Sequence, residues 1–124
     1  MPKTILLAIG TLAGGFCRYW LAGAVYSVLG VQFPHGTMVV NLSGCFAIGL
    51  LNALAEVKLF LGPEARLLLM TGFCGTFTTF STFMLETSNL LKDGEALRAL
   101  CNIAGSLIGG FILFRLGEWL ASSL

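Results

Sequence analysis

The segment from Gly72 to Phe83 places two glycines and five hydroxyl side chains inside a stretch that is otherwise apolar enough to lie in a lipid bilayer. A continuous transmembrane helix satisfies its own backbone hydrogen bonds, whereas irregular backbone in a membrane occurs only where protein buries it or water lies beside it. Glycines and β-branched hydroxyl residues clustered at mid-depth therefore predict a helix that is broken or loosened there. The segment indicates a polar route through a membrane.

The composition agrees with a membrane setting. Hydrophobic residues make up 56% of the 124 residues and charged residues only 10%, which is too little charge to cover a water-soluble domain of this length. The net charge of +1 leaves no basic face for nucleic acid. We therefore expect an integral membrane protein that does not bind nucleic acid.

Four apolar spans are separated by short polar turns. The spans are residues 4–29, 36–60, 65–91 and 96–121. Each is near the roughly 20 residues that cross about 30 Å of hydrocarbon. The first span has the position of a secretory signal, but it is too long and lacks a small-residue cleavage site, so we expect it to be retained. The sequence thus predicts an all-α membrane protein with one four-helix domain over residues 1–124, its third helix broken mid-membrane.

The basic residues near the ends of the spans are almost balanced between the two membrane faces. They are Lys3, Lys58, Arg66 and Arg115 on one face, and Lys92 and Arg98 on the other. Because Lys and Arg in short loops set the orientation of a membrane protein, this near balance permits insertion in both directions. Charge counting therefore predicts dual topology.

Arg18 lies within the first span, where an arginine costs about 2.5–3.5 kcal/mol unless it snorkels, pairs or faces water. In one interpretation it snorkels to the lipid headgroups beside Tyr19 and Trp20. In the other, it is a positive charge at the mouth of a pathway and raises the local concentration of an anion. Either interpretation argues against a cation pore lined by acids.

Two further polar residues lie inside apolar spans. The amide of Asn41 must find partners, either as a hydrogen bond across helices or as a replacement for water around a small dehydrated anion. Glu86 lies one turn past Phe83, and we expect it to pair with a hydroxyl such as that of Thr37, to be protonated, or to take part in transport.

Phe80 and Phe83 share one helical face of the third span, and Thr79 and Thr82 share an adjoining one. Phenylalanines at this spacing usually pack in a core or against lipid. The hydroxyls beside them favour a second interpretation, because the edge of an aromatic ring is positive and hydroxyls donate further hydrogen bonds. A site of this kind suits a small, strongly hydrated anion.

The predicted break also frees carbonyl oxygens near Gly75 and Thr78, which suit a monovalent cation. One chain supplies too few oxygens for a cage, so this inference favours a dimer. The motifs Gly10–Gly14 and Gly105–Gly109 have the small-xxx-small spacing of close-packed membrane helices and are candidate faces for it.

The remaining reactive side chains give no sign of catalysis. Cys17, Cys45, Cys74 and Cys101 lie within the spans without metal-ligand spacing, and we expect them to act as packing residues. His35 lies alone in a turn. Since no nucleophile, base and metal ligands converge, we do not expect an enzyme.

The ordered motifs Gly14–Tyr19, Gly36–Gly44 and Gly72–Phe83 resemble those of the Fluc (CrcB) fluoride ion channel family, and the resemblance covers the whole chain. It implies an antiparallel, dual-topology homodimer with two fluoride pores and a central structural sodium ion. It also implies passive export of fluoride from the cytoplasm across the inner (plasma) membrane.

The resemblance assigns roles by position. Phe80 and Phe83 match the pore phenylalanines, and Asn41 matches the pore asparagine. Thr79, Ser81 and Thr82 match the polar track, and Thr37 and Glu86 match a pathway threonine and glutamate. Arg18 matches the vestibule-side arginine, and the carbonyls of Gly75 and Thr78 match the sodium site. On the fourth span the family places a vestibule serine. Ser106 and Asn102 are available for that role, while Gly109 and Gly110 occupy the expected register.

Two other classes of protein remain as alternatives. A small multidrug exporter is also a short four-helix protein, but it needs a membrane-embedded glutamate in its first helix, where this chain has Arg18. A non-transporting membrane assembly subunit would use the polar third span for packing alone.

Overall fold

The computed structural model describes residues 1–124 and is entirely helical. Four helical segments are long and apolar enough to cross a membrane, judged by length and composition. They are α1 (Lys3–Leu29), α2 (His35–Glu56), the third span Pro63–Lys92, and α6 (Ala96–Ser122). These segments confirm the predicted spans, except that the second ends at Glu56 and the chain then turns through Leu59, whose φ is +56°.

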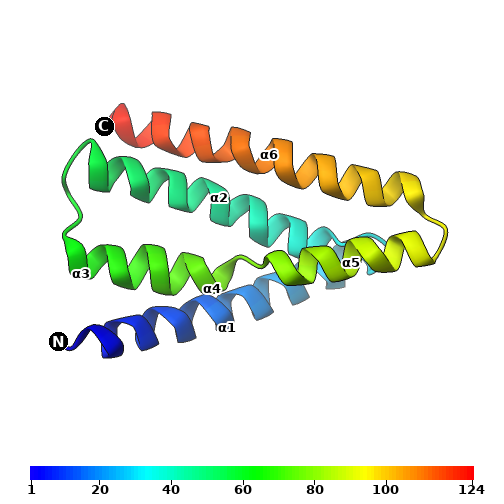
Figure 1. Cartoon of the computed structure of the whole chain (residues 1–124), viewed down its shortest axis with the longest axis horizontal. Helices are drawn as coiled ribbons and strands as arrows, with labels where there is room; N and C mark the ends of the chain where they lie inside the picture. The colour runs from blue at the N-terminus through cyan, green and yellow to red at the C-terminus, as the bar shows by residue number, and fades with distance from the viewer.

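The third span consists of four consecutive pieces. They are α3 (Pro63–Arg66), the π-helical η1 (Leu67–Cys74), α4 (Gly75–Phe77) and α5 (Phe80–Lys92). The spans run alternately up and down, so both termini and the α2–α3 connection lie at one end of the molecule (Figure 1). Within this bundle α2 packs mainly along α6, and α1 packs mainly along η1. By contrast, α5 has few contacts with the rest of the chain.

The Gly10–Gly14 motif closes α1 against the third span of the same chain. A Cβ at Gly10 would overlap the carbonyl oxygen of Leu68, and one at Gly14 would overlap the carbonyl oxygen of Phe73. Only glycine permits this approach of helix to backbone. The motif therefore serves packing inside the chain, which corrects its interpretation as a dimer face.

The Gly105–Gly109 motif also faces its own chain. A Cβ at Gly105 would lie 3.2 Å from the side chain of Met38, and one at Gly109 would lie 3.1 Å from that of Leu42, both on α2. This second motif therefore belongs to the seam between α6 and α2, and its interpretation as a dimer face is likewise corrected.

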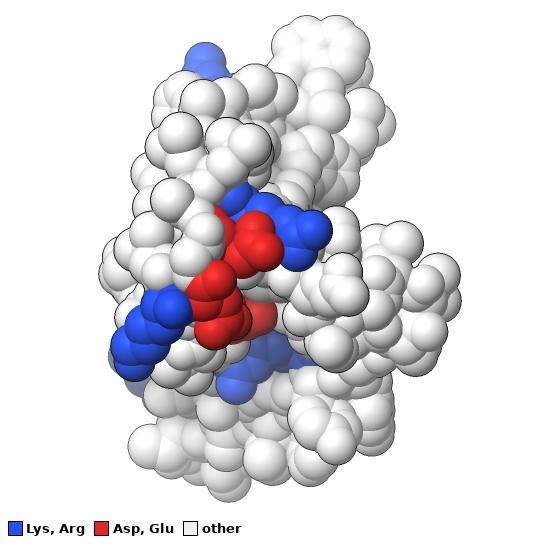
Figure 2. Space-filling view, turned by 90° about the vertical axis from the view of Figure 1, so that its right-hand side faces the viewer, with Lys and Arg blue, Asp and Glu red and all other residues white.

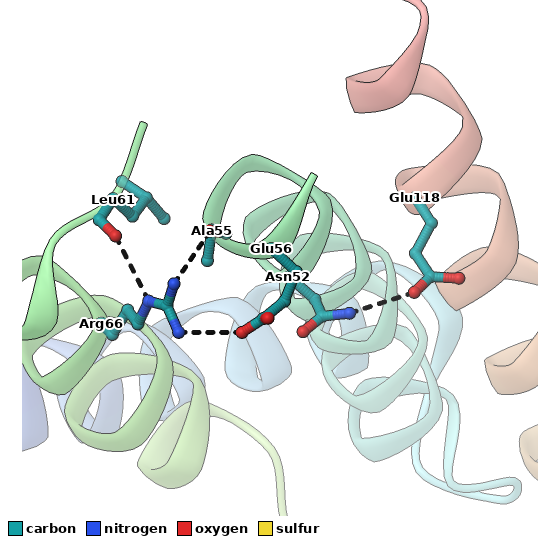
Figure 3. A network of polar contacts seen from close by, with 6 residues as sticks. All are labelled: Asn52, Ala55, Glu56, Leu61, Arg66 and Glu118. Atoms are coloured by element: carbon teal, nitrogen blue, oxygen red, sulfur yellow. Dashed lines mark hydrogen bonds and ion pairs between the residues drawn. The ribbon is translucent and has the colours of Figure 1, made fainter. Parts of the chain in front are cut away.

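Arg66 closes the connection between α2 and α3 (Figure 3). Its guanidinium donates to the carbonyl oxygen of Ala55 at 2.8 Å, that of Leu61 at 3.2 Å, and the carboxylate of Glu56 at 2.8 Å. At the same end, the Asn52 amide donates to Glu118 at 3.1 Å and ties α2 to α6. These contacts fix the loop from which the third span begins.

The opposite end of the molecule carries charges of both signs. Figure 2 shows acidic and basic side chains lying beside one another at the end where α5 and α6 join. The exposed charged residues of this connection are Lys92, Asp93, Glu95 and Arg98. Their place between two membrane-spanning segments agrees with a tight turn in the aqueous or headgroup layer.

Candidate functional site

The third span is interrupted at Thr78 and Thr79. Both residues are extended, with φ and ψ of −87° and 158° at Thr78 and −147° and 119° at Thr79. The side chain of Thr79 caps the new helix α5, because its Oγ1 accepts a hydrogen bond from the backbone N–H of Thr82 at 3.3 Å. This interruption confirms the predicted break and locates it.

Asn41 of α2 clamps the interruption. Its Nδ2 donates to the carbonyl oxygen of Thr79 at 2.9 Å, and the N–H of Thr79 donates to its Oδ1 at 2.8 Å. Both backbone groups of Thr79 lie outside a helix and would otherwise be unpaired. Of the two roles considered for Asn41, the hydrogen bond across helices is thus present in the structure, and one amide hydrogen is left over.

The carbonyl oxygens before the interruption lose their usual partners. The N–H of Thr78 bonds to Cys74 at 3.2 Å and that of Thr79 bonds to Asn41, so neither bonds to the carbonyl of Gly75. The carbonyl of Thr78 accepts no hydrogen bond either. The two carbonyls considered as cation ligands are therefore not used within the chain.

A cavity of about 660 Å³, here called the Arg18 cavity, lies between α1, α2 and α5. Its polar lining residues are Arg18, Tyr19, Tyr26, Thr37, Thr79, Thr82 and Glu86. The structure thus brings together five of the predicted residues, Arg18, Thr37, Thr79, Thr82 and Glu86, from three separate helical segments. The three ion pairs of the structure do not include Arg18.

A second cavity of about 270 Å³, here called the Phe83 cavity, lies between α2, α5 and α6. Its lining includes Asn41, Thr78, Thr79, Phe80, Phe83 and Ser106. The rings of Phe80 and Phe83 meet edge-on, with centroids 5.9 Å apart and planes at 61°. Phe83 is 5% exposed, whereas Phe80 is 70% exposed. Thr79 lines both cavities, so the interruption of the helix lies where the two adjoin.

Glu86 is held by two hydroxyl groups. Tyr26 donates to its Oε2 at 2.6 Å, and the Thr37 hydroxyl donates to its Oε1. The expected pairing with Thr37 is therefore present, while the contact from Tyr26 was not predicted.

On α6, the structure distinguishes the two polar candidates. The Ser106 hydroxyl lines the Phe83 cavity and is a buried side-chain oxygen without a hydrogen-bond partner. The Asn102 amide instead donates to the Thr87 hydroxyl at 2.9 Å, and the Thr87 hydroxyl donates to the carbonyl of Phe83 at 2.7 Å. Asn102 thus joins α6 to α5 and lines neither cavity.

Comparison with known proteins assigns the chain to a family. Residues 5–118 match the family model described as CrcB-like protein, Camphor Resistance (CrcB). The chain belongs to the CrcB family. With four spans of membrane length it is a multi-pass membrane protein, which in bacteria lies in the inner membrane.

Three CrcB relatives show the extent of the similarity. The protein from Chlorobaculum tepidum is 50% identical over 121 residues, covering 98% of this chain and 95% of the relative. Those from Maridesulfovibrio salexigens and Solidesulfovibrio magneticus are 46% and 47% identical over 111 residues, covering 90% of this chain and 88% and 89% of the relatives. All three are named fluoride-specific ion channel FluC, a name that describes a channel rather than an enzyme.

Two residues of the CrcB chain depart from the sequence-based interpretation. Ser81 is exposed and lines neither cavity. Tyr26 lines the Arg18 cavity but was not singled out. Its spacing from Arg18 would have identified it. Arg18, Ala22 and Tyr26 follow one another at intervals of four residues and therefore share a face of α1.

Proposed function

We propose that this chain is the subunit of a fluoride-selective channel that passively exports fluoride from the cytoplasm and so lowers fluoride toxicity. The names of the CrcB relatives support the proposal. The observation that carries it is the interruption at Thr78 and Thr79, with a cavity on either side that polar side chains line in part, inside a span of membrane length. A packed bundle without a transport role would have no use for such an interruption, which costs helix hydrogen bonds.

Selectivity in this proposal follows from how closely the pore coordinates a dehydrated fluoride ion. Fluoride would exchange its water for the remaining amide hydrogen of Asn41, the hydroxyl of Ser106, and the positive ring edges of Phe80 and Phe83. The Ser106 hydroxyl supports this role because it has no partner within the chain. Larger halides cost less to dehydrate than fluoride, so they would be excluded by size, because they could not approach these donors closely enough to gain the same coordination.

The hydroxyls of Thr79 and Thr82 would continue the polar track into the Arg18 cavity. These two oxygens lie 3.0 Å apart, and both residues line that cavity. There Arg18 would raise the local anion concentration, because its charge is not cancelled by an ion pair in the chain. Ser81, which is exposed, would contribute only where a second chain covers it.

An antiparallel, dual-topology homodimer is part of the proposal. Two observations support it: the near balance of basic residues between the two ends, and the sparse contacts of α5, which leave Phe80 and Ser81 exposed. A second copy packed against α5 would cover Phe80 and complete the wall of the Phe83 cavity. Cross-linking of single-cysteine variants across α5, in membranes, tests this arrangement.

A structural sodium ion fits the same arrangement. The carbonyl oxygens of Gly75 and Thr78 are hard donors not engaged by their usual N–H partners, and two chains would supply two such pairs. The ion would neutralise the partial charges of these carbonyls at the dimer axis. Replacing sodium by N-methylglucamine should then weaken the dimer, measured by its dissociation on dilution in detergent.

Flux from liposomes tests the proposed function. Vesicles containing the purified protein are loaded with potassium fluoride or potassium chloride, and valinomycin provides the countercurrent. We expect fluoride to leave at least about tenfold faster than chloride, since an advantage of about 1.4 kcal/mol in coordination within the pore is a factor of ten. Comparable efflux of both anions, proton-coupled cation export, or no flux at all would refute the proposal.

A further inference from the structure

We propose that Tyr26 is a positioning residue that holds Glu86 against α1 and α2 and thereby keeps Arg18 available to an anion. This inference rests on the proposed function, because it concerns how the Arg18 cavity receives fluoride.

The contacts of Tyr26 are directed and its ring is fixed. The hydroxyl donates to Oε2 of Glu86 at 2.6 Å, and it accepts from the backbone N–H of Thr37 at 3.4 Å. The ring lies against Gly36, where a Cβ would overlap ring atoms of Tyr26. The start of α2 thus determines where the hydroxyl of Tyr26 lies.

Together Tyr26 and Thr37 engage both oxygens of the Glu86 carboxylate. One donor comes from α1 and the other from α2, while Glu86 itself lies on α5. A carboxylate held at two oxygens by donors from two helices has little freedom to turn away. The network therefore fixes the negative charge at one side of the cavity.

The position of Glu86 matters because Arg18 lines the same cavity. In a low-dielectric site a carboxylate and a guanidinium attract each other strongly and pair in bidentate fashion when free to do so. Such a pair would cancel the positive charge of the cavity. Arg18 forms no ion pair here, and the Glu86 carboxylate accepts hydrogen bonds from two hydroxyl groups instead.

The decisive variants are Tyr26→Phe alone and Tyr26→Phe combined with Glu86→Gln. Tyr26→Phe keeps the ring against Gly36 and removes only the donor to Glu86. We expect fluoride efflux from liposomes to fall about tenfold, the size of one lost charge-assisted hydrogen bond. Since an amide has no charge to cancel Arg18, the double variant should match the efflux of Glu86→Gln alone.

Ser27→Ala is the matched control. Ser27 lies next to Tyr26 on the same helix, lines neither cavity, and its hydroxyl donates only to the carbonyl of Ala24 in its own helix, at 2.7 Å. Its removal should leave efflux unchanged. Unchanged efflux in Tyr26→Phe would overturn the inference, and so would a loss that Glu86→Gln does not relieve, because that loss would reflect packing.

Infrared spectroscopy separates this inference from the proposed function. The carboxylate stretch of Glu86 is identified as the band lost in Glu86→Gln, and it should shift in Tyr26→Phe but not in Ser27→Ala. A shift supports the positioning role even in a protein that conducts no fluoride. An unshifted band in a fluoride-conducting protein refutes the positioning role alone.

Discussion

The side-chain amide of Asn41 pairs with both backbone groups of Thr79, at 2.9 Å and 2.8 Å, in the manner of a neighbouring β-strand. An unpaired backbone group in hydrocarbon costs several kcal/mol. One side chain on α2 therefore makes a non-helical residue tolerable within the third span. The same residue lines the Phe83 cavity, so one side chain both supports the interruption and contacts the proposed pathway.

Asn41→Leu should weaken both the fold and the pathway. It leaves the N–H and the carbonyl of Thr79 unpaired, at a cost of about 1–3 kcal/mol for each group. Thermal unfolding in detergent measures the stability, and efflux from liposomes measures the loss of fluoride flux. Asn52→Leu is the control, since Asn52 lies on the same helix and bonds Glu118 away from both cavities. Equal effects of the two variants on flux would contradict this role for Asn41.

Phe80→Ile and Phe83→Ile should both suppress fluoride flux but should differ in stability. Phe83 is 5% exposed, so its replacement removes packing worth about 1–2 kcal/mol. Phe80 is 70% exposed in the single chain, and its replacement should cost little in monomer stability. Flux and unfolding are measured side by side, with Phe111→Ile on the exposed face of α6 as control. Normal flux in both pathway variants would remove the rings from the mechanism.

Ser106→Ala should lower fluoride flux without lowering the stability of the protein. The buried hydroxyl has no partner, so its removal should leave the unfolding free energy unchanged or raise it by up to about 1 kcal/mol. Fluoride flux should nevertheless fall, because a donor in the Phe83 cavity is lost. Ser43→Ala is a suitable comparison, since the Ser43 hydroxyl bonds its own helix at Val40. A destabilised Ser106→Ala protein would show that the hydroxyl has a structural partner.

Gly14→Ala and Gly15→Ala should differ in their effect on stability. A Cβ at Gly14 would overlap the backbone of Phe73, whereas one at Gly15 meets no atom within 4 Å. We expect Gly14→Ala to destabilise the protein by about 1–3 kcal/mol through overpacking, and Gly15→Ala to be neutral. The midpoint of thermal unfolding in detergent gives the comparison. Equal midpoints would mean that α1 shifts along η1 at little cost.

The sequence predicted the interruption of the third span but not the π-helical segment before it or the end of the second span. Hydroxyls and glycines are costly in lipid, so the segment Gly72–Phe83 was informative on its own. The π-helical turns of η1 have no comparable signal, because the same apolar residues suit an α-helix equally well. The second span was predicted to reach residue 60 because apolar residues continue past Glu56, whereas the helix ends there and the chain turns at Leu59.

Residue spacing likewise identified the close-packing glycines without identifying their partners. Small residues four positions apart allow any helix to approach, so Gly10–Gly14 did not distinguish a second chain from the chain's own third span. The partners of Asn41 and Glu86 also depended on tertiary structure. Only the fold brings Thr79, Tyr26 and Thr37 to those two side chains.

The interruption at Thr78 and Thr79 also creates two oppositely charged helix ends in the middle of one span. The end of α4 presents carbonyl groups, and the start of α5 presents N–H groups, which act as partial negative and positive charges of about half an elementary charge. Neither end contains an ionisable group. The backbone contribution to the electric field at this point therefore does not titrate, and it persists at any pH at which the helices remain folded.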